Sequence, residues 1–229
     1  MQTALIVGAG SGLSASLARL LVSENFRVAL AARNLEKLSA LQALALRCDA
    51  TDATQVEDAF RAVEAKWGVP DLVVYNASYR TRGAFIDLKQ DEVRKTLEVS
   101  AYAGFLVAQA AARRMLPRGS GAIFFTGASA SVKGYPQSAP FAMGKFALRG
   151  LAQSLARELS PKNIHVAHFV IDGGIRDDAR AGGDARAAER GEDGMLLPDE
   201  IAKSYLHVYR QHRSAWSWEL ELRPWVEKF

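Results

Sequence analysis

Three glycines near the start of the chain, Gly8, Gly10 and Gly12, have the spacing of a phosphate-binding turn. They follow a short apolar run at residues 3–7 and open a helical pattern near Ser11. A residue without a Cβ lets the backbone turn sharply and lets a pyrophosphate approach main-chain N–H groups. The helix N-terminus adds unpaired N–H groups and the positive end of its dipole. The sequence therefore predicts a dinucleotide site, and a tight turn without a ligand is the alternative.

The elements that would position this turn alternate along the chain. Continuous apolar runs separated by amphipathic patterns are typical of a parallel sheet covered by helices on both faces. We expect strands at 3–7, 27–31, just before 48, 71–75, 122–126, 164–171 and 216–222. We expect helices at 35–44, around 56–63, at 91–115 with a break near 102, at 141–159 and at 198–211. The predicted fold class is α/β, a single doubly wound domain over residues 1–229.

Composition limits the classes of function. The chain has 229 residues, 49% hydrophobic and 24% charged, with a net charge of +4. The positive charges are scattered, so we expect no nucleic-acid surface. No apolar run reaches the ~20 residues of a membrane span, so we expect no membrane partner and a cytoplasmic location. With 4 His, a single cysteine (Cys48) and no paired ligand spacing, we expect no metal site.

One segment differs in composition from the rest. Residues 177–194 combine glycine, alanine and dense charge with almost no large apolar side chain. Such a segment buries too little surface to order itself strongly. We therefore expect residues 177–197 to be a mobile lid over a substrate, with a disordered surface loop as the alternative.

Further along the chain, other short motifs stand in a recognisable order. Asn76-Ala77 follows the fourth strand, Lys145 lies in the start of the helix at 141–159, and Asp172-Gly173-Gly174 follows the sixth strand. Together with the glycine turn and Asp49, these residues make the chain resemble the short-chain dehydrogenase/reductase family over nearly its full length. The resemblance implies a seven-stranded Rossmann sheet, a nicotinamide cofactor, a small-molecule substrate and a homodimer or homotetramer.

The cofactor site is expected at the glycine turn and at the ends of the neighbouring strands. By resemblance, Asp49 meets the adenine edge and Asn76 packs near the ribose, although Asn76 is also a common turn residue. Lys145 hydrogen-bonds the nicotinamide ribose by the same resemblance, and its alternative is a plain lysine in a first helical turn. The expected cofactor-binding residues are Gly8, Gly10, Ser11, Gly12, Leu13, Arg33, Asp49, Asn76, Ala77, Lys145, Gly173 and Ile175.

Arg33 bears on the choice of cofactor. An enzyme that selects NAD places a carboxylate after the second strand, where it accepts hydrogen bonds from the ribose 2′-OH. The sequence has Ala31, Ala32 and Arg33 there, and a guanidinium is a good partner for a 2′-phosphate. We expect NADP(H) to be preferred, with NAD(H) possible. The alternative is that Arg33 is a solvated surface charge.

The residues that perform chemistry in this family are replaced. Phe141 occupies the position of the catalytic tyrosine, and phenylalanine has no proton to transfer. Ala128 occupies the serine position, with Ser129 beside it, and Ser100 occupies the asparagine position, whereas Lys145 is kept. Smaller departures are Ser14 for the third glycine and Asp172 for the usual proline.

Two functions are compatible with this pattern. The first is an NADP(H)-dependent oxidoreductase with an altered proton donor, for which Lys145, Ser129 and Tyr135 are the candidate catalytic residues. Tyr135 is equally explained as a packing residue in a Gly-Tyr-Pro turn. His165 and His168 lie within an apolar strand and are expected to be core residues. The second function is a catalytically silent NADP(H)-binding or regulatory protein, which explains most simply why three positions changed together.

Overall fold

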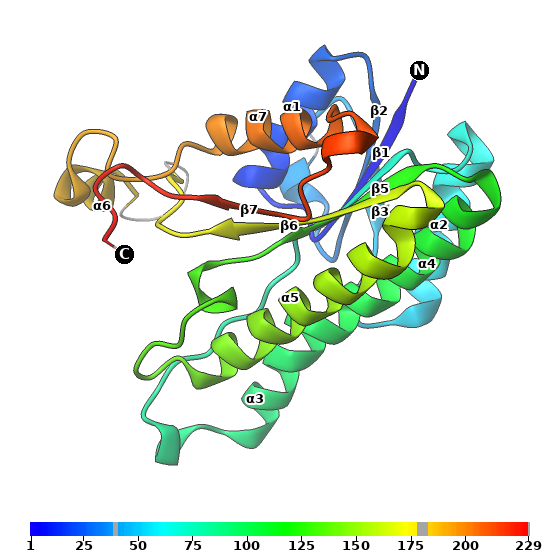
Figure 1. Ribbon diagram of the computed structural model, residues 1–229. Coiled ribbons are helices and arrows are strands. Elements are labelled where there is room, and N and C mark those ends of the chain that lie inside the picture. Colours follow the sequence, from blue (N-terminus) through cyan, green and yellow to red (C-terminus); the bar gives the residue numbers. More distant parts are fainter. Residues whose placement is uncertain (39–40, 178–182, 229) are drawn as a thin grey trace.

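The protein is built on a seven-stranded sheet, seen here in a computed structural model that describes residues 1–38, 41–177 and 183–228 (Figure 1). All neighbouring strands are parallel, in the order β3-β2-β1-β4-β5-β6-β7. The predicted doubly wound α/β fold with seven parallel strands is therefore confirmed. The strands are β1 (Thr3–Val7), β2 (Arg27–Ala32), β3 (Leu44–Arg47), β4 (Leu72–Tyr75), β5 (Gly121–Thr126), β6 (Ile164–Ile171) and β7 (Glu219–Leu222).

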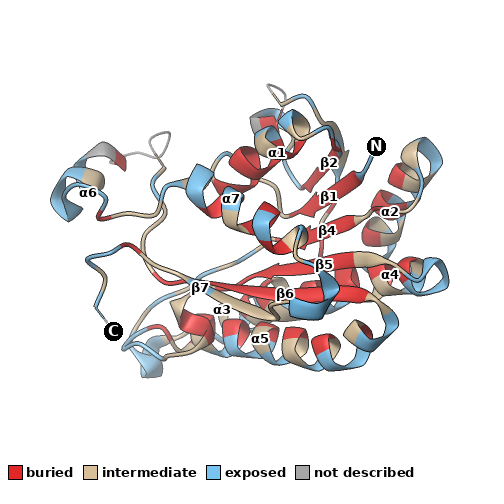
Figure 2. Cartoon of the chain, turned by 45° about the horizontal axis from the view of Figure 1, so that its top comes forward, coloured by how far each residue is buried: buried red, intermediate tan, exposed pale blue. Residues whose placement is uncertain are grey.

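Helices cover the two faces of the sheet. One apolar core lies between the sheet and helices α2 (Ala53–Trp67), α4 (Ala103–Arg118) and α5 (Ala139–Leu159). A second core lies between the other face and helices α1 (Leu13–Ser23) and α7 (Pro198–Tyr209). Figure 2 shows that the central strands are buried along their whole length, as expected for strands covered on both sides. This explains why β1, β4 and β6 read as uninterrupted apolar runs rather than as alternating ones.

The strand order reverses direction beside β1. The chain runs outward from β1 to β2 and β3, then returns to place β4 on the other side of β1. In open parallel sheets, ligands bind outside the carboxyl ends of the strands at such a reversal. The residues that follow β1 and β4, Gly8 and Asn76, meet there, because the backbone N–H of Asn76 donates to the carbonyl of Val7 at 2.8 Å.

The break expected near Tyr102 is a change of helix type. Helix α3 (Gln90–Leu97) and helix α4 are joined by a π-helical turn, η3 (Glu98–Tyr102). Single π turns of this kind are frequent at functional sites. Ser100 lies in this turn with its side chain fully buried, so the extra residue aims position 100 inward.

Two expected helical features were wrong. In place of the helix expected at 35–44, the described residues form a 3-10 turn, η1 (Glu36–Leu38), and the chain is extended by Leu44. Leu44 belongs to β3, where it pairs with Ala29 of β2, so a helix cannot extend to the expected end at 44. The helix expected to end at 115 continues to Arg118 with Pro117 inside its last turn, and Gly119 ends it in the left-handed conformation.

The segment expected to be a loop contains a helix. Helix α6 (Gly183–Arg190) lies within it, beyond the end of β6 (Figure 1), and residues 178–182 lie outside the described residues. The alanine content of this segment favours helix even though its few apolar side chains predicted little order. Its proposed role as a lid stays a prediction.

Among the described residues, we find no helix whose length and apolar character would let it cross a bilayer.

Candidate functional site

Gly8 makes the turn from β1 possible. Its φ is +83°, a conformation that L side chains rarely adopt, and a Cβ there would collide with the backbone of Ala77. The N–H groups of Gly8 and Ala9 both donate to the carbonyl of Ala31, at 2.9 and 3.1 Å. The turn is therefore held between the ends of β2 and β4.

The N-terminus of α1 is left open by this turn. Gly12 is its N-cap, no side chain of the described residues caps it, and its first turn carries no acidic residue. A Cβ built on Gly10 or Gly12 would meet nothing within 4 Å, so space lies beside both residues. Unpaired helix N–H groups beside an open space are what an anion needs. The geometry fits the pyrophosphate of a dinucleotide.

Ser14, in place of a third glycine, is compensated by a hydrogen bond. Its buried hydroxyl accepts from the side-chain amide of Asn76 at 2.7 Å, which joins the first turn of α1 to the end of β4. Asn76 is thus held in a fixed orientation at the expected ribose position. A serine in place of a glycine at position 14 therefore does not disrupt the arrangement of α1 and β4.

A cavity of about 450 Å³ extends from the glycine turn toward β2 and β3. Arg33 and Asp49 line it at the ends of these two strands, together with Ala77. The carboxylate of Asp49 accepts hydrogen bonds from the backbone N–H and the hydroxyl of Thr51, at 3.0 and 2.8 Å. Arg33 thus offers a cation where a 2′-phosphate is expected. The loop that carries Asp49 offers hydrogen-bond acceptors where an adenine is expected.

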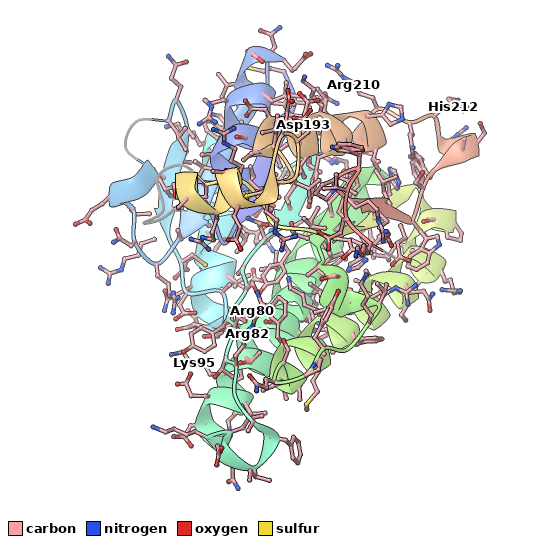
Figure 3. All side chains as sticks on the ribbon, turned by 90° about the vertical axis from the view of Figure 1, so that its left-hand side faces the viewer. Arg80, Arg82, Lys95, Asp193, Arg210 and His212 are labelled. Atoms are coloured by element: carbon pink, nitrogen blue, oxygen red, sulfur yellow. The ribbon has the colours of Figure 1, made fainter. Side chains whose placement is uncertain are left out.

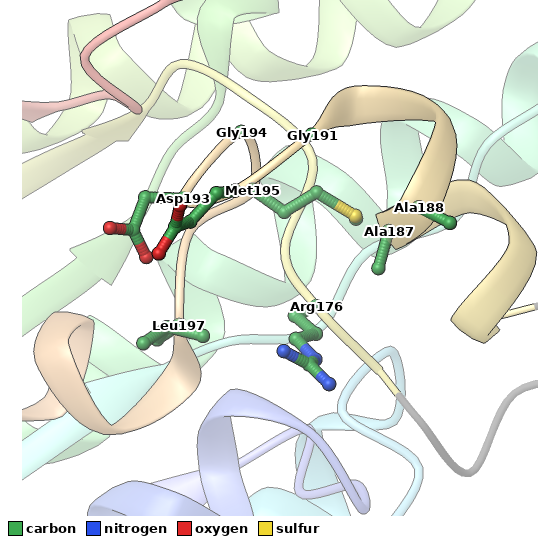
Figure 4. Close-up of a pocket in the computed structure, with 9 residues that line it drawn as sticks. Arg176, Ala187, Ala188, Gly191, Asp193, Gly194, Met195 and Leu197 are labelled. Carbon is green, nitrogen blue, oxygen red and sulfur yellow. The ribbon is translucent and has the colours of Figure 1, made fainter.

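A larger cavity, of about 840 Å³, lies on the other side of the same glycines. It brings together the predicted residues of the glycine turn and of the β6 turn, and it adds residues from the β4 loop and from α6. Its lining includes Gly8, Gly10, Gly12, Leu13, Asn76, Gly173 and Ile175 among the predicted residues, with Arg80, Asp177, Glu189 and Arg190 added. A third cavity, of about 430 Å³, lies beside the C-terminal end of α6, and the guanidinium of Arg176 points into it (Figure 4). Met195 lines both the second and the third cavity.

Phe141, expected at the position of the catalytic tyrosine, is buried in the first turn of α5. Its ring lies between two cations: the Arg80 Cζ is 4.8 Å and the Lys145 Nζ is 5.9 Å from the ring centroid. The ring offers these cations only its π face, because it has no hydroxyl. Proton transfer from position 141 is therefore impossible in this chain.

Lys145 is almost fully buried, at 3% exposed, and its Nζ donates to the carbonyl of Thr126 at 2.8 Å. Burial lowers the pKa of Lys145 to about 8, since an ammonium loses its hydration in the interior. A carbonyl partner orients the amine without neutralising it. The lining of the two cavities around the glycine turn does not include Lys145, so its contact with a nicotinamide ribose stays a prediction.

Burial of Lys145 predicts a measurable dependence of stability on pH. The folded pKa, about 8, lies below the ordinary value of 10.5. Between these values the unfolded state binds the additional proton, so the contribution of this group to stability rises with pH. For Lys145→Met, we expect the wild-type-minus-variant difference in unfolding free energy to rise by about 2–3 kcal/mol between pH 7 and pH 10.

Urea unfolding of both proteins at the two pH values measures this difference. Lys162→Met is the matched control, because Lys162 is an exposed lysine beyond the end of the same helix and should show no such change. A Lys145→Met difference that stays constant with pH would show that this lysine is not titrating as a buried group.

The other expected catalytic residues, Ser129 and Tyr135, lie on the segment that joins β5 to α5. Ser129 is partly buried in a 3-10 turn after β5, next to Ala128, whose backbone N–H donates to the hydroxyl of Ser131 at 3.1 Å. Tyr135 is 43% exposed on the turn that precedes α5. Ser100 bridges the backbone of Tyr79, accepting from its N–H at 3.5 Å and donating to its carbonyl at 3.3 Å. These contacts give Ser100 and Ser131 structural roles, and the catalytic roles of Ser129 and Tyr135 remain hypotheses.

His165 and His168 are core residues, as expected. His165 bonds the carbonyl of Ser217 at 2.9 Å, and the Nδ1 of His168 lies 3.0 Å from a carboxylate oxygen of Glu219. Burial lowers the pKa of His168 to about 4, so its ring is neutral at pH 7 and donates to Glu219. Arg149 also holds this carboxylate, with two hydrogen bonds of 2.6 and 2.8 Å. The network fixes β7 against α5 below the site.

Sequence reasoning missed two features of the site. Asp172 is buried, and its carboxylate accepts from Lys133 at 3.0 Å and from Arg223 at 2.5 Å, which ties the loop after β5 to the end of β7. Arg80 lines the larger cavity and stacks on Phe141. The available signal for Arg80 was its place four residues after Asn76, on the loop that leaves the carboxyl end of β4.

Comparison with known proteins places this geometry in a family. A family model described as short chain dehydrogenase matches residues 2–181. Trans-4-hydroxycyclohexanecarboxylate dehydrogenase from Sinomonas cyclohexanicum is 32% identical over 196 residues, covering 79% of this chain and 75% of that protein.

Solved structures agree with this result. A short-chain dehydrogenase from Rhodopseudomonas palustris is 33% identical with a TM-score of 0.81, over 97% of this chain and 99% of the other. A metagenomic short-chain oxidoreductase solved with NADP is 25% identical with a TM-score of 0.82, over 97% of each chain. The chain therefore belongs to the short-chain dehydrogenase family.

Proposed function

We propose that this protein is an NADP(H)-dependent oxidoreductase that works without the family tyrosine. The observation that carries the proposal is the pair of cavities around the glycine turn, with the uncapped N-terminus of α1 between them and Arg33 at the β2 end. The metagenomic relative solved with NADP supports the choice of nucleotide.

Different residues would bind different parts of the dinucleotide. The N–H groups of the glycine turn and of α1 would hold the pyrophosphate, with Ser11 and Leu13 at the helix entrance. Arg33 would pair with the 2′-phosphate, Asp49 with the adenine, and Lys145 with the nicotinamide ribose. When bound, the nicotinamide supplies hydride transfer, which the protein need only orient.

Loss of general acid help typically lowers a rate by ~10²–10⁴-fold, so an activated carbonyl or enone suits this site better than a plain ketone. Candidate donors within the chain are Lys145, through its lowered pKa, and Tyr135, on the neighbouring turn. A homo-oligomer is part of the proposal, supported by exposed apolar side chains on η3, α4 and α5, namely Tyr102, Phe105, Met143 and Phe146.

A second candidate function is a catalytically silent NADP(H)-binding protein. The buried, purely aromatic Phe141 favours it, as do the structural contacts that occupy Ser100 and Ser131. Tight NADPH binding without turnover over a broad panel of carbonyls and enones would support this function over the first.

Removal of the Arg33 charge tests the nucleotide preference. We expect wild-type protein to bind NADPH more tightly than NADH, and Arg33→Ala to reduce that ratio by roughly 10–100-fold, the usual value of a charge-assisted hydrogen bond. Fluorescence titration with each nucleotide measures the ratio. Arg27→Ala is the matched control, because Arg27 is exposed at the opposite end of β2. An unchanged ratio in Arg33→Ala would refute the assignment.

A further inference from the structure

Arg80 and Arg82 form a pair of cations near the part of the site where the nicotinamide and a substrate are expected. Both come from the loop that follows β4, and Figure 3 shows their side chains close together. Partial burial and, after it, the nearby charge of Arg82 lower the pKa of Arg80. Both side chains are exposed, so water and salt reduce their repulsion, and an anion bound between them would remove the rest.

Four other cations around this site have acidic partners. Lys133 and Arg223 share Asp172, Arg149 binds Glu219, and Arg190 lies 3.4 Å from Glu227. Within the described part of the chain, no hydrogen bond or ion pair joins Arg80 or Arg82 to a carboxylate, although Asp177 and Glu189 line the same cavity as Arg80. Arg80 instead stacks on the ring of Phe141.

The surroundings of Arg80 indicate what kind of ligand it could bind. Arg80 lines the 840 Å³ cavity that includes the glycine turn and the β6 turn, and Phe141 is the residue at the tyrosine position. The Nζ of Lys145 lies 5.9 Å from the centroid of the same ring and is buried against the carbonyl of Thr126. A ligand that enters this cavity on the side of the β4 loop therefore meets the guanidinium of Arg80, whereas Asp177 and Glu189 line other parts of the cavity. A guanidinium fork matches the oxygens of a carboxylate or a phosphate.

We propose that the substrate of this site is a small carbonyl compound or alcohol that carries an oxyanion, and that Arg80, assisted by Arg82, binds that oxyanion. The proposal rests on the proposed function, because it assigns the substrate class of the same site. Arg80 is then a specificity-determining residue, and stacking on Phe141 holds its guanidinium in place before the substrate arrives.

Matched probes test the proposal. We choose 4-formylbenzoate, its methyl ester and 4-formylphenyl phosphate, which share an aromatic aldehyde and differ in the charged group. Calorimetric titration into wild-type protein at low salt, with and without saturating NADP⁺, should show the carboxylate or the phosphate binding about 10- to 100-fold more tightly than the ester. The tighter of the two anions identifies the source of the oxyanion.

Variants then locate the effect. Arg80→Gln should bring the anion-to-ester ratio to within about twofold of one, and Arg82→Gln should reduce it partly. Arg94→Gln, which removes an exposed charge from the adjacent helix α3, should leave the ratio unchanged. Thermal unfolding of each variant confirms that the fold is intact.

Equal binding of anion and ester to wild-type protein would overturn the proposal, as would an Arg80→Gln, Arg82→Gln double variant that keeps the wild-type ratio. Absence of binding by all three probes at millimolar concentration also overturns it. Titration of the same samples with NADPH separates a failure of this proposal from a failure of the proposed function. Wild-type protein that does not bind NADPH would count against the proposed function alone. The anion-to-ester ratio, which is also measured without nucleotide, tests the role of Arg80.

Discussion

Gly8→Ala is expected to destabilise the whole protein, whereas Gly12→Ala is expected to leave it folded but poor at binding NADPH. Gly8 has a φ of +83°, and its new Cβ would collide with the backbone of Ala77, which cannot move without disturbing the end of β4. We expect a loss of more than about 2 kcal/mol in the free energy of unfolding. Gly12 has a φ of −85° and a ψ of −120°, a combination that L side chains rarely adopt, although its Cβ would point into open space.

The two substitutions separate two roles within one motif. Gly12→Ala should lower the free energy of unfolding by about 1–2 kcal/mol, because the change lies at an N-cap with an unusual ψ, and it should leave the protein folded. The same methyl would occupy the space through which a pyrophosphate approaches α1, so we expect NADPH to bind roughly 10–100-fold more weakly. Urea unfolding and nucleotide titration of both variants measure the two effects. If Gly12→Ala binds NADPH like the wild type, the pyrophosphate does not lie where we place it.

The sheet was predictable from the sequence because its physical signal is local. Strands buried on both faces read as continuous apolar runs, and β1, β4 and β6 could be read directly. The glycine turn was predictable for the same reason, since a positive φ and a close approach at Gly8 both require glycine. The break at Tyr102 was visible, although its π-helical form was not.

The features that were missed depend on contacts between distant residues. The helix expected at 35–44 gave way to pairing of β3 with β2, which no local pattern at Leu44 reveals. The hydrogen bond between Ser14 and Asn76 joins residues that are 62 positions apart in the sequence. The contact of Arg80 with Phe141 joins the loop after β4 to the first turn of α5. A departure from a family motif can be read from the sequence, but whether another residue compensates for it depends on the packed structure.

Phe141→Tyr is the substitution with the largest expected effect on chemistry. The side chain at position 141 is 8% exposed and lies between Arg80 and Lys145, so a phenol there would lie near two positive charges. Such charges favour the phenolate and lower the pKa of a tyrosine, which improves it as an acid. We expect kcat/KM for NADPH-dependent reduction of small ketones to rise by about 10²–10⁴-fold.

Initial rates over a panel of neutral and anionic ketones measure this gain, with Phe141→Leu as the control that changes packing without adding a proton. Gain by Phe141→Tyr alone would show that the nucleotide, the substrate and Lys145 already lie in a productive arrangement. A gain that appears only when Ala128→Ser is added would show that the carbonyl oxygen also needs a donor from the loop after β5. No gain in either variant, with NADPH binding intact, would favour the silent binding protein, because a restored proton donor would then have no bound substrate to act on.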